Sequence, residues 1–225
     1  MILNPHKTPA KVNEMSISKR VYEYMLDVYW IFSSVLAIYY WTQKDWYHLS
    51  ITLGTFLIPM LLWYIWDWLK LKSVWQVNAL ILAFTFIGYS LGSCLDLFAR
   101  IAWFDKVPHT LSGPFVALLA MMLFYVLKPN HRIERADTPL LITFSFCVSV
   151  CVAGLWEIGE IILTPIVGRN LQRVDTGVTD TMQDMIVCTL GTLALMPFIP
   201  RFCRGQAGWL TAIIEAFVKT NYPEA

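Results

Sequence analysis

Six long stretches of apolar residues constrain this chain more than any other feature of its sequence. They cover approximately residues 25–42, 49–68, 76–99, 109–127, 139–163 and 181–200. A helix needs roughly 20 apolar residues to cross the hydrocarbon core of a bilayer, and it satisfies its own backbone hydrogen bonds while doing so. The sequence therefore predicts an all-α, polytopic transmembrane bundle of about six helices.

The composition agrees with a membrane protein and argues against a nucleic-acid partner. Hydrophobic residues make up 57% of the chain, and charged residues only 15%. The formal net charge is +1, and no basic run is long enough to attract a polyanion. The predicted partner is therefore the lipid bilayer itself.

Lysine and arginine are distributed unequally between the two sides of the expected bundle. Twelve lie in the two tails and in the loops 69–75 and 128–138, and five lie in the alternate loops. Because cytoplasmic segments are enriched in these residues, both termini are predicted to be cytoplasmic. The predicted organisation is a cytoplasmic tail over 1–24, a transmembrane domain over 25–200 and a cytoplasmic tail over 201–225.

The C-terminal tail has a helical pattern of its own. Its apolar residues recur at the spacing of one helix face: Trp209, Leu210, Ile213, Ile214, Phe217 and Val218. A short amphipathic helix lying at the membrane interface is the predicted structure.

Acidic residues and one histidine gather near particular ends of the apolar segments. They are Asp96, Asp105, His109, Glu157, Glu160, Asp175, Asp180 and Asp184. The third and fifth segments end on the side where the fourth and sixth begin, which the charge count makes the exterior. Glu157 and Glu160 share one helix face, as do Asp180 and Asp184. We therefore expect one acidic site at the outer face.

Carboxylates with one imidazole suit a divalent cation, and paired acids can also exchange protons. The candidate metal ligands are Asp105, His109, Glu157, Glu160, Asp180 and Asp184, and the candidate catalytic residues are Glu157, His109 and Asp184. A divalent metal is the one cofactor that this set suggests. Asp96 and Asp175 are expected to be peripheral.

Several of these residues also have structural interpretations. They are a capping box with Gln183 for Asp180, a cap or a pair with Lys106 for Asp105, a pair with Arg100 for Asp96, and a turn for Asp175. The other histidines, His6, His48 and His131, fall in expected tails and loops and are predicted to be solvated.

Three motifs in order resemble the YjdF-type family of bacterial inner-membrane proteins. They are Phe104-Asp105-Lys106-x-x-His109 with Ser112-Gly113, Trp156-Glu157-x-x-Glu160, and Asp180-Thr181-x-x-Asp184-Met185 with Leu190-Gly191. The spacing before Asp180 departs from the family pattern near Asp175. The family is distantly similar to VanZ-like membrane proteins. The resemblance implies the bacterial inner membrane, but no established activity.

Three functions fit these observations. The site could process a lipid or envelope-linked substrate, with Arg169 and Arg173 meeting an anionic head group. It could instead serve an ion- or proton-coupled transporter, whose sites usually lie near the membrane midplane. Third, the acids could form a non-enzymatic polar lock that ties helices together.

Overall fold

The computed structural model describes residues 10–129, 131–168, 171, 178–206 and 208–223, with side chains from residue 19 onward. It is an all-helical, polytopic bundle, as predicted. Within the described residues, six helical stretches are long and apolar enough to cross a membrane: Lys19–Gln43, Trp46–Trp68, Trp75–Cys94, Lys106–Leu127, Arg135–Val167 and Val178–Cys203. Each of the six expected segments overlaps one of these.

The chain forms two compact units, Met1–Leu95 and Asp96–Ala225. The single transmembrane domain expected over residues 25–200 contains the boundary between them. The first unit holds α1 (Ala10–Gln43), α2 (Trp46–Thr55), α3 (Leu57–Trp68), α4 (Trp75–Thr85) and the π-helix η1 (Phe86–Cys94). The second holds α5 (Leu97–Arg100), α6 (Lys106–Leu127), η2 (Arg135–Asp137), α7 (Thr138–Val167), α8 (Val178–Leu195), α9 (Phe198–Cys203) and α10 (Trp209–Asn221).

In the first unit, Pro59 explains why the second span divides into α2 and α3. Proline has no N–H, so Pro59 cannot donate to the carbonyl of Thr55, four residues earlier. The hydroxyl of Tyr29 donates to that carbonyl instead, at 3.0 Å. A side chain of α1 thus satisfies the backbone group that the proline leaves without its helical partner.

The third span is shorter than the predicted segment 76–99. Its second half is the π-helix η1, and it ends at Cys94, whose carbonyl accepts a hydrogen bond of 2.6 Å from the Tyr40 hydroxyl. Asp96 then adopts a left-handed backbone with φ of 63° and begins the short helix α5. The continuous helix expected through residue 99 is therefore wrong, because the left-handed backbone of Asp96 interrupts the helix between Cys94 and Leu97.

His48 also differs from the solvated side chain that was expected. Its Nδ1 lies 2.6 Å from Asp45 Oδ2, and its ring stacks on Tyr40 with centroids 5.0 Å apart. Only 13% of the side chain is exposed. Asp45 caps α2 at the same time, because its carboxylate accepts the backbone N–H of His48.

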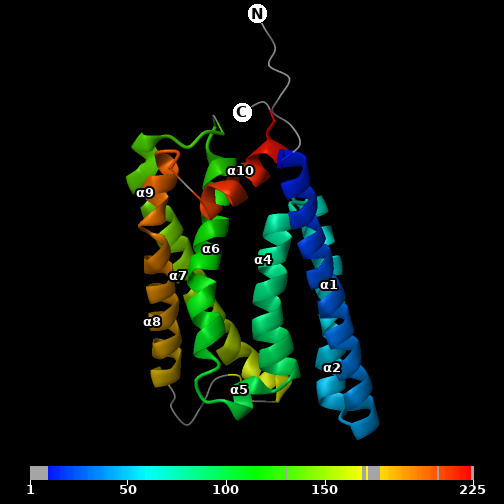
Figure 1. Ribbon diagram of the computed structural model, residues 1–225. Coiled ribbons are helices and arrows are strands. Elements are labelled where there is room, and N and C mark those ends of the chain that lie inside the picture. The colour runs from blue at the N-terminus through cyan, green and yellow to red at the C-terminus, as the bar shows by residue number, and fades with distance from the viewer. Residues whose placement is uncertain (1–9, 130, 169–170, 172–177, 207, 224–225) are drawn as a thin grey trace, which may run out of the picture. The chain divides into compact units, whose positions relative to one another are not determined.

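In the second unit, α6, α7 and α8 lie side by side, and two glycines set the crossing of α6 with α8 (Figure 1). A Cβ on Gly191 would lie 2.1 Å from the carbonyl oxygen of Thr110, and one on Gly113 would lie 2.2 Å from that of Cys188. Pro114 contributes, because it cannot donate to the Thr110 carbonyl that faces Gly191. Small residues therefore allow the two backbones to touch.

A buried hydrogen-bond cluster joins the same three helices. Ser149 of α7 donates to the carbonyl of Gly113 at 3.0 Å, and its oxygen lies 2.8 Å from the hydroxyl of Thr192 on α8. The serine is 1% exposed, and the threonine is fully buried. These contacts fix how α7 sits against the α6–α8 pair.

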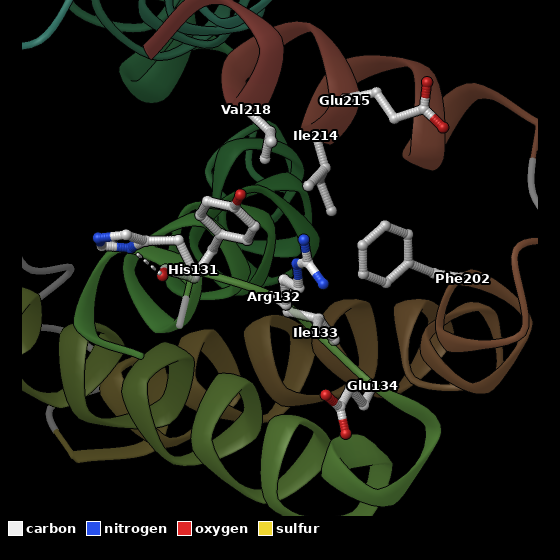
Figure 2. Close-up of a pocket in the computed structure, with 9 residues that line it drawn as sticks. His131, Arg132, Ile133, Glu134, Phe202, Ile214, Glu215 and Val218 are labelled. Atoms are coloured by element: carbon white, nitrogen blue, oxygen red, sulfur yellow. Dashed lines mark hydrogen bonds between the residues drawn. The ribbon is translucent and has the colours of Figure 1, made fainter. Parts of the chain in front are cut away.

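At the end of the second unit where α6 ends, α10 lines a cavity of about 470 Å³ beside the loop that follows α6 (Figure 2). His131 of that loop packs on Tyr222, with ring centroids 4.5 Å apart, and its Nδ1 lies 3.3 Å from the carbonyl of Tyr125. His131 therefore packs against the C-terminal end of α10. The solvated side chain expected for His131 is not observed.

Candidate functional site

The first turn of α6 supplies three members of the site. The helix begins at Lys106, three residues before the predicted segment, and Asp105 is its N-cap. Asp105 makes no side-chain capping bond to the helix backbone. Spacings of three and four residues place Asp105, Lys106 and His109 on one face. That face is turned toward α7 and α8.

The other members come from the end of α7 and the start of α8, which lie at the same end of the unit as the start of α6 (Figure 1). Glu157 is nearly three turns before the end of α7, and its side chain is 5% exposed. Asp180 and Asp184, one turn apart on α8, have side chains 8% and 3% exposed. The structure thus brings together residues from three helices.

His109 stands between carboxylates on both sides of its ring. Its Nδ1 lies 3.8 Å from Glu157 Oε1. Its Nε2 lies 3.6 Å from Asp105 Oδ1 and 3.9 Å from Asp184 Oδ1. The imidazole is 11% exposed, so these acids surround it in a largely water-free setting.

Lys106 is the residue that sequence reasoning missed, apart from a possible pair with its neighbour Asp105. Its Nζ donates to Asp180 Oδ1 at 2.7 Å and to both oxygens of Asp184 at 2.8 Å. Asp105 Oδ2 is farther away, at 3.6 Å. The signal that could have found it is the motif Asp105-Lys106-x-x-His109, which places an ammonium on the face of the histidine.

Carboxylates outnumber cationic groups among the described residues of the site. Among the described residues that touch His109 or Lys106, four carboxylates face one ammonium and one imidazole. Buried like charges at such distances repel strongly, because the surroundings screen them poorly. Carboxylate oxygens and an imidazole nitrogen gathered in this way are groups that can hold a metal cation or protons.

Three of the predicted ligands form a group compatible with a metal ion. Asp105, His109 and Asp184 each offer one ligand atom, and these atoms lie within 4.8 Å of one another. Two ligands about 2.1 Å from one ion stand roughly 3 to 3.5 Å apart. The His109–carboxylate separations of 3.6 and 3.9 Å therefore require only a small closure around an ion.

Other predicted residues are not members of this group. Glu160 accepts a hydrogen bond of 2.7 Å from the indole of Trp156, one turn earlier on α7. Asp96 begins α5 with its backbone carbonyl accepting from Ala99 and Arg100. Arg169, Arg173 and Asp175 lie outside the described residues, so their expected roles stay predictions.

The model of a family described as "Predicted membrane protein (DUF2238)" matches residues 22–204. The match spans all six apolar segments and every residue of the site. Neither the curated proteins nor the solved structures contain a match to the chain.

Proposed function

The chain belongs to the DUF2238 family of predicted membrane proteins, and we propose that its buried site binds a divalent cation through Asp105, His109 and Asp184. Two carboxylate oxygens and one imidazole nitrogen are a donor set that suits Mn²⁺ or Zn²⁺. The remaining positions around the ion would be open to water or substrate.

The position of Glu157 carries this proposal. A histidine that ligates a metal through one nitrogen commonly presents its other nitrogen to a carboxylate, which orients the ring. Here Nε2 of His109 faces the two aspartates, while Nδ1 faces Glu157 Oε1 at 3.8 Å. The geometry supports Glu157 as the orienting residue and His109 as the ligand.

The proposed chemistry is metal-assisted or acid–base attack on a lipid or envelope-linked substrate. The site residues of α6 and α8 lie in the first two turns of these helices, at the ends of two candidate spans. This supports a position near one membrane surface, within reach of a lipid head group. Transporter sites usually lie near the midplane, so this position favours surface chemistry. The proposed setting is the outer face of a bacterial inner membrane, in a YjdF-type, distantly VanZ-like protein with both termini cytoplasmic.

Metal content of the detergent-purified protein tests the proposal. Elemental analysis and titration with Mn²⁺ and Zn²⁺ would be compared for the wild type and four variants: Asp184→Asn, His109→Gln, Glu157→Gln and Glu160→Gln. We expect the first two to lose the metal, because each removes a ligand. Glu157→Gln should weaken binding by about tenfold or more, as expected for an orienting residue.

Glu160→Gln is the matched control, since Glu160 lies one turn from Glu157 on the same helix but bonds to Trp156. It should bind metal as the wild type does. Thermal unfolding of each variant separates loss of metal from loss of fold. A wild-type protein that takes up neither ion would overturn the proposal.

A structural lock is the second candidate, and the three hydrogen bonds of Lys106 favour it. They join the start of α6 to the start of α8 without any ligand. Under this alternative, Asp184→Asn and His109→Gln lower the unfolding temperature while no variant, nor the wild type, binds metal.

A further inference from the structure

Lys106 holds a position that bears directly on any cation bound at Asp184. Its ammonium engages both oxygens of that carboxylate, each at 2.8 Å. The same carboxylate offers a ligand atom to the group formed with Asp105 and His109. The hydrogen bonds of Nζ place the lysine head group inside the site.

A divalent ion and an ammonium compete for such a carboxylate. A lone pair of Asp184 that accepts a hydrogen bond from Lys106 cannot coordinate an ion at the same time. In addition, the ammonium and the ion repel each other when they are held a few ångströms apart. An ion at Asp184 therefore gains affinity when the ammonium moves away.

Asp180 can hold the ammonium when its bonds to Asp184 are broken. Its Oδ1 accepts from Nζ at 2.7 Å, and Asp180 is not part of the metal group. It lies one turn before Asp184 on the same face of α8, so a small rotation of the lysine side chain can break the bonds to Asp184 while the bond to Asp180 is kept.

We propose, on the basis of the proposed function, that Lys106 is a tethered competitor that regulates the site. A divalent cation binds Asp184 by displacing the ammonium from it, and the ammonium then stays bonded to Asp180 alone. The lysine thereby keeps the acidic pair neutralised and sets the concentration of ion at which the site fills. Asp180 acts through Lys106, as a positioning residue.

Mn²⁺ binding to the full-length protein in detergent, followed by the electron paramagnetic resonance signal of free Mn²⁺, tests this role. The variants are Lys106→Gln, Asp180→Asn and the double variant. Lys106→Gln should bind Mn²⁺ about tenfold more tightly or better, because it removes the competing charge. Asp180→Asn should weaken binding, because among the described residues Asp184 is then the one carboxylate within hydrogen-bond distance of the ammonium.

The double variant gives the sharpest comparison, because it removes one positive and one negative charge and so keeps the net charge of the site. If only net charge mattered, its affinity would equal that of the wild type. Competition predicts binding about threefold or more tighter than the wild type, since no ammonium remains at Asp184. It also keeps the test available if Lys106→Gln alone fails to fold.

The two proposals fail in different ways. If Mn²⁺ binds the wild type, and binds the double variant with equal or lower affinity, the competitor role is wrong and the proposed metal site is still supported. If neither the wild type nor any folded variant binds Mn²⁺, both proposals are wrong.

Discussion

Gly191 of α8 lies against the backbone carbonyl of Thr110 in α6, so closely that a Cβ there would come within 2.1 Å of the oxygen. This contact lies two turns from Asp184 along α8. The distance between the two helices at the site therefore depends on a residue that has no side chain and no chemistry of its own.

Gly191→Ala should force α6 and α8 apart. We expect a loss of about 1–3 kcal/mol in unfolding free energy, as for other overpacked contacts. The measurement is thermal or denaturant unfolding in detergent. Gly159→Ala is the matched control, because a Cβ there meets nothing within 4 Å. Equal stability of the two variants would contradict the close crossing.

The hydrogen bond between Ser149 and Thr192 should couple α7 to α8. Hydrogen bonds between membrane helices contribute about 0.6 kcal/mol on average and up to about 1.7. A double-mutant cycle of Ser149→Ala and Thr192→Ala should give a coupling energy in this range. Thr189→Ala serves as control, since its hydroxyl bonds only to Met185 within its own helix. A coupling energy of zero would show that the two hydroxyls do not interact.

Tyr29→Phe should destabilise the first unit, because it removes the hydroxyl that donates to the Thr55 carbonyl. Pro59 has no N–H and cannot donate to that carbonyl. A buried carbonyl without its partner costs about 1–3 kcal/mol. Pro59→Ala restores an N–H, so Tyr29→Phe should cost less in that background. Unfolding of the single and double variants measures both effects. Tyr39→Phe, at a side chain 53% exposed, is the control, and an equal cost in both backgrounds would contradict the explanation.

The proposed orientation predicts which positions a membrane-impermeant thiol reagent reaches. In a variant without native cysteines, Asn170→Cys should be labelled on intact cells, because it lies in an expected outer loop. Gln206→Cys, in the C-terminal tail, should be labelled only after lysis. The reverse pattern would place the acidic site on the cytoplasmic side.

The spans could be predicted because each depends on local properties. Length and apolar content placed all six, and alternation of direction placed Glu157 and Asp184 at one end of the bundle. The exceptions have local causes that apolar content does not reveal. The third span ends at Cys94 because Asp96 takes a left-handed backbone, and the second divides because Pro59 lacks an N–H.

Membership of the site was harder to predict. Spacing placed Glu157 and Glu160 on one face of α7, but the structure brings Glu157 to His109 and leaves Glu160 with Trp156. A helix face spans a wide arc, and only its centre reaches a neighbouring helix. The direction of that centre depends on packing, which spacing alone does not define.

The sequence by itself determined that the chain crosses a membrane, about how many times, and that acids and one histidine lie at one end of their helices. These follow from the cost of exposing backbone and charge to lipid, which applies to each segment separately. Only the tertiary structure decided that Lys106 bonds Asp180 and Asp184, residues more than 70 positions away. That pairing depends on how α6 and α8 cross at Gly113 and Gly191, and crossing is a property of two surfaces together.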